Sequence, residues 1–154
     1  MNKNLEAFLC MIAWAEIGPE MLADPRTDLG YKVIVGSLPG KLHLFQDYSD
    51  HPRIYVEAMD STAAGRYQIL KRNYDHYKPI LNLSDFSPSS QDAIAVQLIK
   101  ERRALQDIYD GKIVQATHKV RTAWASLPDS PYGQPTRRVE PLILSYRAAG
   151  GTLA

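Results

Sequence analysis

The stretch that decides the fold is LEAFLCMIAWAEIG, residues 5–18. Leu5, Phe8 and Ile12 follow one another at steps of three and four, which predicts a helix with an apolar face. Glu16 comes four residues after Ile12 and therefore falls on the same face. A carboxyl group at the edge of an apolar face needs a physical reason to be there.

Two interpretations of Glu16 follow from its position. Burial at the end of the helix removes water from the charged form and raises the pKa, which is how an enzyme makes a general acid from glutamate. Alternatively, Gly18 and Pro19 end the helix and Glu16 simply points into solvent. Spacing alone favours the second interpretation, so the rest of the chain has to decide.

The composition is that of a soluble globular protein, with 154 residues, 45% apolar and 23% charged. A chain of this length forms one domain and buries a core without metal or disulfide staples. Residues 1–60 carry a net charge of −4 and residues 61–154 carry +5. A block of +5 is modest for a nucleic-acid binder, so we expect no nucleic-acid partner.

The cysteine and histidine residues give no sign of a redox or metal site. Cys10 is the only cysteine, so no intramolecular disulfide can form, and it lies in an apolar run. The histidines are scattered, with no pair at metal-ligand spacing: His43, His51, His76 and His118. We therefore expect no metal and no cofactor.

The N-terminus imitates a secretion signal in AFLCMIAWA, residues 7–15. However, Glu6 interrupts the apolar run, Lys3 is the only positive charge nearby, and cleavage after Ala15 would be unusually early. No stretch approaches the roughly 20 apolar residues of a membrane span. We expect a protein without a signal peptide that stays in the cytoplasm and has no stable membrane association.

Three segments in the first half of the chain have the composition of β-strands. YKVIV at 31–35 is β-branched and aromatic, GSLPGK at 36–41 supplies turn residues, and LHLFQDY at 42–48 alternates enough to be a hairpin partner. IYVEAM at 54–59 is a plausible third strand. These segments predict a small antiparallel β-lobe.

From Ser61 onward the pattern is helical. Ser61 or Thr62 can cap a helix that continues to Tyr77 before Pro79 ends it. Three further helices are expected, over 89–103 after a Ser-Pro start signal, over 112–127 with the clearest amphipathic spacing, and within 139–151, where the two final glycines stop it.

The expected architecture is an α+β fold, with a β-lobe at about 20–60, a helical lobe at about 61–154 and a cleft between them.

The segment STAAGRYQIL, residues 61–70, is the second informative stretch. Its small residues would let a ligand or another backbone approach closely, while Tyr67 and Gln68 offer a ring for stacking and a bifunctional amide. The alternative is a capped helix whose Gly65 packs tightly against a neighbour. The spacing alone does not separate these two interpretations.

Six segments together carry a resemblance. AWAEIG, YKVIVG, DYSDHPR, STAAGRYQIL, FSPSSQDAIAVQLIKER and WASLPDSPYGQ resemble, in the same order, segments of the phage lambda endolysin family of peptidoglycan lytic transglycosylases. The resemblance covers nearly the whole chain. It implies a lysozyme-like fold, with Glu16 at the position of the family's catalytic glutamate.

The resemblance also implies a reaction. In the family, the glutamate protonates the β-1,4 glycosidic oxygen between N-acetylmuramic acid (MurNAc) and N-acetylglucosamine (GlcNAc). The muramic 6-hydroxyl then attacks, giving a 1,6-anhydro product and leading to host cell lysis. The implied substrate is the glycan strand of peptidoglycan, the implied assistant a holin-type protein that releases the enzyme from the cytoplasm to the cell wall, and the expected state a monomer. Residues of the matched segments that could contact sugar are Asp47, Tyr48, Ser49, Ser61, Gln68, Tyr132 and Gln134.

Two alternatives stay open beside this reading. A hydrolytic lysozyme would pair Glu16 with a second carboxylate, for which Asp24, Asp28 and Asp47 are available. A non-catalytic peptidoglycan-binding protein could keep the fold and lose the activity.

The chain also departs from the family pattern. Ala15 and Ile17 stand where we expect Ser and Gly, and Ala63 stands where we expect Gly. The loop at 36–46 is longer than the family's equivalent and could act as a lid.

Overall fold

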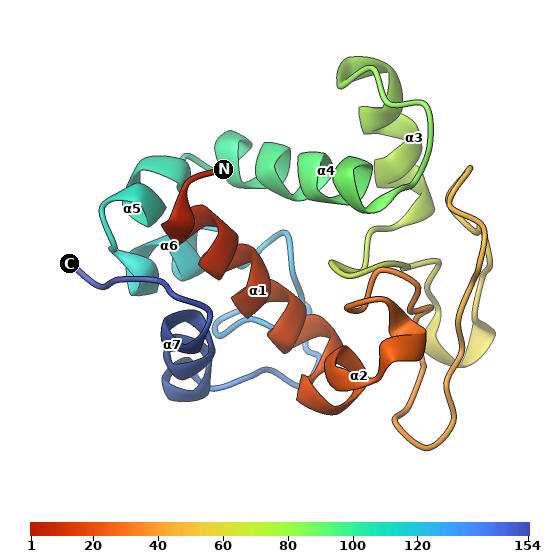
Figure 1. Ribbon diagram of the computed structural model, residues 1–154, viewed down its shortest axis with the longest axis horizontal. Coiled ribbons are helices and arrows are strands. Elements are labelled where there is room, and N and C mark those ends of the chain that lie inside the picture. The colour runs from red at the N-terminus through yellow and green to blue at the C-terminus, as the bar shows by residue number, and fades with distance from the viewer. The chain divides into compact units, whose positions relative to one another are not determined.

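Helices are the only regular elements in the computed structural model, which describes all 154 residues (Figure 1). None of them has the length and apolar composition needed to span a bilayer. The α-helices are α1 (Lys3–Ile17), α2 (Pro19–Ala23), α3 (Lys71–Ile80), α4 (Pro88–Glu101), α5 (Leu105–Tyr109), α6 (Ile113–Lys119) and α7 (Val139–Ala148), and two 3₁₀ turns are η1 (Pro25–Thr27) and η2 (Glu57–Met59).

The chain forms two compact units. Unit 1 comprises residues 1–16 and 96–154, and unit 2 comprises residues 17–95. The division runs through α1 and through α4, so each of these helices contributes to both units. That the whole chain acts as one catalytic domain stays a prediction.

The first predicted helix is confirmed as α1, but its apolar stripe is wider than the spacing predicts. Phe8 and Ile12 are buried, as the spacing requires, and Met11 and Ala13 on other sides of the helix are fully buried as well. A helix that is apolar nearly all round is an interior helix. Glu16 therefore stands at the end of a buried helix rather than on one face of an amphipathic one.

The predicted antiparallel β-lobe is wrong, because the structure contains no β-strand. The pairing of the predicted hairpin does occur, since Val33 bridges Leu44 and Ile34 donates its amide to the His43 carbonyl at 2.9 Å. However, this pairing and four others are isolated bridges of a single residue pair. Unit 2 is thus a set of turns and short helices held by single bridges, and the class is helical rather than α+β.

Backbone turns explain why no ladder forms over 31–35. The amides of Tyr31 and Val33 donate to carbonyls three residues back, at 3.0 and 3.2 Å, and so curl the segment, which leaves single bridges in place of a continuous ladder. Val33 and Ile34 are adjacent and both buried, so the in-and-out alternation of a strand is absent. Gly36, with φ +84°, then turns the chain away. β-Branched composition favoured a strand here, and local turn geometry overrode it.

The predicted helix over 63–77 begins later than expected. Residues 61–70 form turns, because Gly65 and Gln68 have φ values of +86° and +49° that no α-helix contains. The predicted cap at Ser61 or Thr62 is therefore wrong, and the N-cap residue of α3 is Leu70. Thr62, nine residues before the first residue of α3, still accepts the Lys71 amide at 3.0 Å.

The turn at 64–69 is positioned by α4. Gln91, fully buried on α4, accepts the Arg66 amide at 3.0 Å and donates to the carbonyls of Tyr31 and Phe86 at 3.2 and 3.0 Å. The next residue along α4, Asp92, accepts the hydroxyls of Tyr31 and Tyr67 at 2.8 and 2.7 Å. These bonds join three separate segments of unit 2 around α4.

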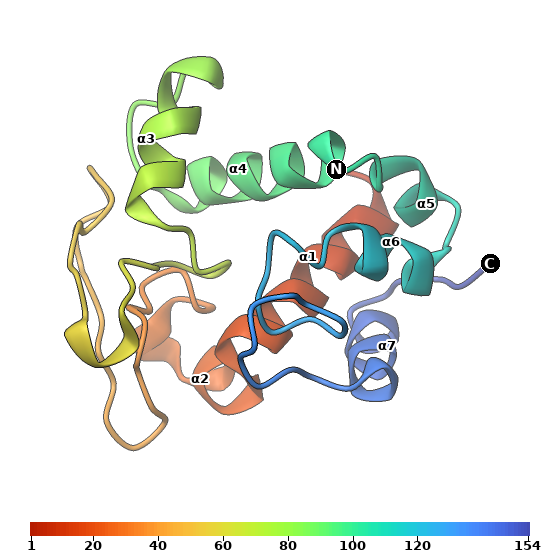
Figure 2. The ribbon, with the colours of Figure 1, turned by 180° about the vertical axis from the view of Figure 1, so that it is seen from behind.

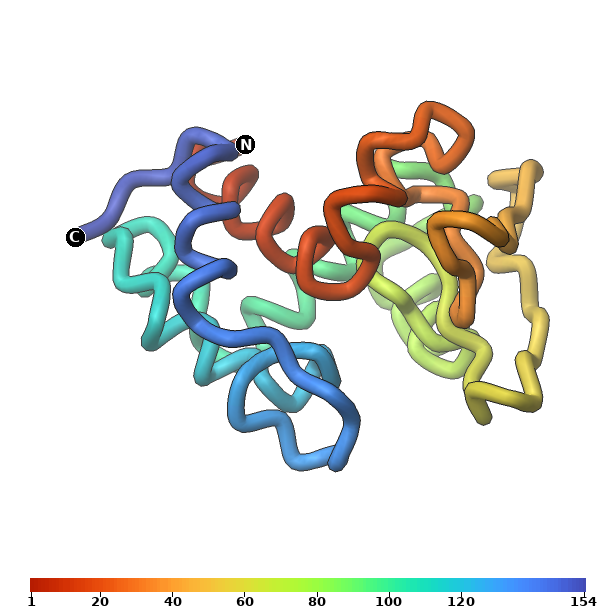
Figure 3. The backbone as a smooth tube through the Cα atoms, turned by 90° about the horizontal axis from the view of Figure 1, so that it is seen from below, coloured from red at the N-terminus to blue at the C-terminus, as the bar shows by residue number.

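The helices predicted over 89–103 and 139–151 are confirmed as α4 and α7, whereas the one over 112–127 is shorter than predicted. α6 ends at Lys119, and Val120, Trp124 and Leu127 stay buried in the turns that follow. Turns also bring residues three and four apart to one side, so the spacing predicted the buried positions correctly, while the predicted helix is wrong only beyond Lys119. Figure 3 traces residues 120–138 as irregular bends between α6 and α7.

Candidate active site

Glu16 lies in the last turn of α1, half-buried between the buried residues Ala15 and Ile17. Burial is the largest influence on its carboxyl group, and it raises the pKa of Glu16 from an ordinary 4.5 to about 7. The end of a helix adds to this effect in principle, since the negative end of the helix dipole disfavours a carboxylate. Near neutral pH, both the protonated and the ionised form of Glu16 are thus populated.

Ser126 is the strongest influence in the opposite direction. Its hydroxyl faces the Glu16 carboxyl and acts to lower the pKa by favouring the ionised form. Ser126 Oγ is buried and pairs with no other group, and its geometry to Glu16 falls short of a formed hydrogen bond.

Arg137 supplies the positive charge near Glu16 and also lowers its pKa. Its Nε donates to the carbonyl of Ala15 at 3.2 Å, and its guanidinium carbon lies 4.9 Å from the centre of the Trp14 ring. Its backbone amide donates to the Ser126 carbonyl at 2.7 Å. Figure 2 shows the segment that carries Arg137, in light blue, passing over the C-terminal half of α1.

The arrangement gives a carboxyl group able to donate a proton near neutral pH and to take one back. The side chains that act on Glu16 are a hydroxyl and a guanidinium, and no carboxylate is among them. No group of three or more His, Cys, Asp or Glu side chains is placed to hold a metal ion. The chemistry that this geometry supports is general acid and base catalysis by one residue.

The predicted contacts at 47–49 lie together in unit 2. Asp47 is exposed, and the Ser49 amide donates to it at 2.8 Å, which holds the pKa of Asp47 below its usual range. Tyr48 is half-buried, with its hydroxyl donating to Asp28 at 2.6 Å and its ring edge-on to Phe45. Asp47 and Ser49 therefore present polar groups to solvent, while the Tyr48 hydroxyl is already engaged.

Ser61 and Gln68 lie at the two ends of the turn segment, also in unit 2. Ser61 accepts the Ala63 amide at 3.0 Å, and the Gln68 amide nitrogen donates to the carbonyls of Gly65 and Val33 at 2.8 and 3.2 Å. These bonds stabilise the turn itself. The donor of Gln68 is thus used within the protein.

Tyr132 and Gln134 lie in unit 1, on the same segment as Arg137. Both are exposed, and the Tyr132 hydroxyl donates to the Thr122 carbonyl at 2.6 Å. This bond anchors the segment and leaves the ring in solvent. Of the predicted contact residues, only these two lie in unit 1 together with Glu16.

Sequence reasoning missed Ser126, Arg137 and the part played by Trp14. Ser126 belongs to a segment that carries the family resemblance, but nothing in its spacing links it to Glu16. Arg137 contacts Ala15 across 122 positions of sequence, which no local pattern reveals. Trp14 is half-buried, and the Arg137 guanidinium lies over its ring.

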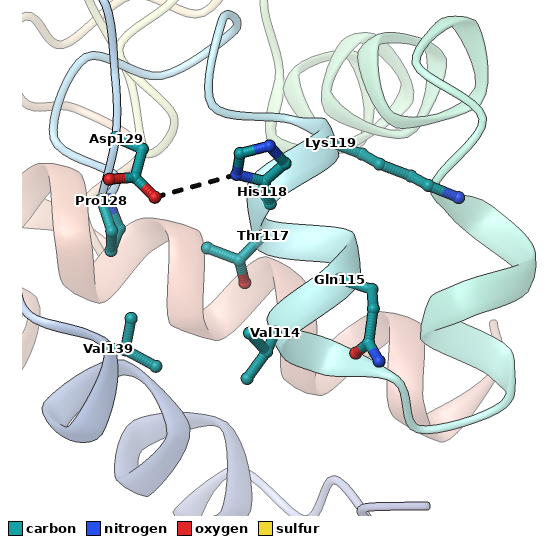
Figure 4. A pocket seen from close by; sticks show the side chains of 8 residues that line it. All are labelled: Val114, Gln115, Thr117, His118, Lys119, Pro128, Asp129 and Val139. Carbon is teal, nitrogen blue, oxygen red and sulfur yellow. Dashed lines mark ion pairs between the residues drawn. The ribbon is translucent and has the colours of Figure 1, made fainter.

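A separate pocket of about 400 Å³ lies between α6 and the start of α7 (Figure 4). Its lining includes the apolar side chains of Val114, Pro128 and Val139. His118 and Asp129, both mostly exposed, approach to 3.8 Å across it, an ion pair worth little in water. None of the predicted site residues lines this pocket.

Comparison with known proteins assigns the family. The family model described as Endolysin matches residues 6–153. The endolysins of Escherichia phage lambda and Escherichia phage P2 are 47% and 44% identical to the chain, over 99% of it and over 95% and 96% of their own lengths.

Two solved structures are similar over the whole chain. A bacteriophage lambda lysozyme complexed with a chitohexasaccharide superposes with a TM-score of 0.89 at 45% identity, covering 100% of this chain and 98% of that one. A second structure of lysozyme from bacteriophage lambda superposes with a TM-score of 0.85 at 44% identity and the same coverage. The chain belongs to the endolysin family.

Proposed function

We propose that this endolysin cleaves the β-1,4 bond between MurNAc and GlcNAc in peptidoglycan by lytic transglycosylation, with Glu16 as acid and base. The observation that carries the proposal is a half-buried carboxyl group whose pKa is raised to about 7 and on which no carboxylate acts. The membership of the endolysin family and the chitohexasaccharide bound to lambda lysozyme support a glycan substrate.

In the proposed reaction, protonated Glu16 donates its proton to the glycosidic oxygen while positive charge develops at the anomeric carbon of MurNAc. The C–O bond breaks and the GlcNAc hydroxyl leaves. The 6-hydroxyl of the same MurNAc then bonds to the anomeric carbon and gives its proton to ionised Glu16. The product is a 1,6-anhydro ring, no water is consumed, and Glu16 ends protonated as it began.

A hydrolytic mechanism has less support, because each candidate for a second carboxylate is already engaged. Asp24 pairs with Arg26 at 2.7 Å, and Asp28 accepts the Tyr48 hydroxyl at 2.6 Å. Asp47 accepts a backbone amide in a tight turn. These contacts are those of residues that stabilise loops and turns.

The remaining assignments extend the proposal to the substrate and the cell. Asp47, Ser49, Tyr132 and Gln134 expose groups suited to sugar, and we assign Tyr48, Ser61 and Gln68 the same role from their matched segments. The enzyme would act as a monomer, remain in the host cytoplasm, and depend on a holin-type protein to reach the wall.

The mass of the products tests the reaction. Purified peptidoglycan is digested and the released muropeptides are analysed by mass spectrometry, and we expect fragments that end in 1,6-anhydro-MurNAc. Fragments heavier by one water, with a free reducing end, would replace transglycosylation with hydrolysis. A protein that sediments with peptidoglycan and releases nothing would be a binding protein.

The Glu16→Gln variant tests the residue. It keeps the shape of the side chain and cannot donate a proton, so product release should fall at least ~100-fold. Glu20→Gln is the matched control, because Glu20 is exposed on α2 and should be dispensable. Release by Glu16→Gln at the wild-type rate would remove Glu16 from the mechanism.

A further inference from the structure

Arg137 directly follows an exposed stretch of chain. Residues 131–136 are all exposed, and Arg137 is half-buried. Three contacts hold it, since its guanidinium donates through Nε to the Ala15 carbonyl and lies over the Trp14 ring, and its backbone amide donates to the Ser126 carbonyl. A single side chain and its own backbone thus join the segment between α6 and α7 to the last turn of α1.

The last turn of α1 is a favourable place for this cation. The final carbonyls of a helix have no partner within the helix and carry partial negative charge. α1 has no basic residue of its own in that turn, and its only charged residue there is Glu16. Arg137 therefore supplies from a distant part of the sequence what the helix end lacks.

We propose that Arg137 is a positioning residue that pins residues 126–137 to the last turn of α1 and so fixes the surroundings of Glu16. The inference rests on the proposed function of Glu16 and assigns Arg137 no contact with substrate. Its planar guanidinium can bond to a carbonyl and stack on an indole at the same time, which a lysine ammonium cannot do.

The pin also places the exposed residues before it. Between the Tyr132 hydroxyl, bonded to Thr122, and Arg137, bonded to Ala15, the chain has two points of attachment. Gln134 lies between them. Loss of the Arg137 attachment leaves this stretch held only through Tyr132, so Gln134 loses a defined position relative to Glu16.

The experiment compares Arg137→Ala, Arg137→Lys and Arg138→Ala by kcat, KM and pH profile on purified peptidoglycan. Arg138 is the matched control, since it is the next residue, largely exposed and only loosely paired with Glu140 at 3.8 Å. In the wild type, activity should fall as pH rises through about 7, because Glu16 must be protonated to act.

We expect Arg137→Ala to lower kcat by ~10-fold through misplacement of groups around Glu16. It should also move the alkaline limb to higher pH, because a cation that lowers the pKa of Glu16 is gone. Arg137→Lys should leave the alkaline limb of the pH profile near its wild-type position, since it keeps the positive charge. It should still lower kcat, because it loses the planar guanidinium that bonds to Ala15 and stacks on Trp14. Arg138→Ala should match the wild type.

Two results would overturn the inference. In the first, Arg137→Ala melts at a lower temperature but keeps wild-type kcat and pH limb below its melting point, which is a structural role alone. In the second, Arg137→Lys has wild-type kcat, which leaves charge as the whole effect. Full activity of Glu16→Gln is a separate outcome, because it contradicts the proposed catalytic role of Glu16 and leaves the contacts of Arg137 with α1 unaffected.

Discussion

At the residue scale, burial and two groups from distant parts of the sequence act on the Glu16 carboxyl. Burial raises the pKa of Glu16 to about 7, and Ser126 and Arg137 limit that rise by favouring the ionised form. A proton donor is most effective when its pKa lies near the working pH. The balance between burial and its two polar neighbours therefore suits Glu16 to both donating and accepting a proton.

The raised pKa makes the stability of the protein depend on pH. The folded state holds the Glu16 proton up to about pH 7, whereas the unfolded chain releases it near 4.5, so this group lowers stability as pH rises between those values. Each pKa unit corresponds to about 1.4 kcal/mol, which sets the loss at up to about 3 kcal/mol.

Glu16→Gln removes this dependence. From pH 4 to pH 8, the variant should therefore gain up to about 3 kcal/mol in free energy of unfolding relative to the wild type. Urea unfolding of both proteins at the two pH values measures the difference, and other titrating groups cancel in the comparison. An equal difference at both pH values would mean that Glu16 titrates as a free glutamate.

At the scale of elements, the turn at 64–69 replaces the helix that composition predicts. Gly65 has φ +86°, and a Cβ added there would overlap the side-chain amide of Gln91, which is fully buried on α4. The small residue at position 65 thus has a packing reason. The absence of a side chain at Gly65 lets the backbone of the turn approach α4 closely.

Gly65→Ala should accordingly destabilise unit 2 by about 3 kcal/mol or more, from an unfavourable φ and an overlap with a buried, hydrogen-bonded amide. Gly133→Ala is one control, because its φ is +71° but its Cβ meets nothing, so it should cost only about 1 kcal/mol. Gly40→Ala, with neither feature, should cost least. Thermal unfolding ranks the three, and an equal loss in all three would contradict the packing argument.

At the scale of the whole molecule, both ends of the chain meet in unit 1. The side chain of Asn4 on α1 donates to the carbonyls of Ile108 and Tyr109, at 3.2 and 3.4 Å, and accepts the Thr152 amide at 3.0 Å. The start of the helix that carries Glu16 is therefore tied to α5 and to the C-terminal residues. Such ties lie far from Glu16 along α1 and hold the helix in place.

Asn4→Ala should lower the free energy of unfolding by about 2 kcal/mol, since it breaks several hydrogen bonds at once. Hydrogen exchange should also rise at the Thr152 amide, which loses its acceptor. Gln115→Ala on α6 is the control, because Gln115 is exposed and should change stability by less than about 0.5 kcal/mol. Unchanged exchange at Thr152 would contradict the tie.

The sequence by itself determined the family and the helices α1, α4 and α7. Contiguous motifs in a fixed order carry the family, and apolar spacing with local start and stop signals carries the helices. The same local reasoning overestimated the strands over 31–59 and the helix over 63–77. There, β-branched and small residues indicated regular structure, and turns with positive φ at Gly36, Gly65 and Gln68 took its place.

Only the tertiary structure decided what surrounds Glu16. Sequence spacing offered two interpretations of its carboxyl, and the structure half-buries it beside Ser126 and Arg137. Arg137 reaches its partner across 122 positions, and no periodicity of strands or helices extends that far. The pKa of an acid depends on its burial and on the charges and hydrogen-bonding groups around it. It is therefore a property of the folded molecule and not of the sequence segment that contains the acid.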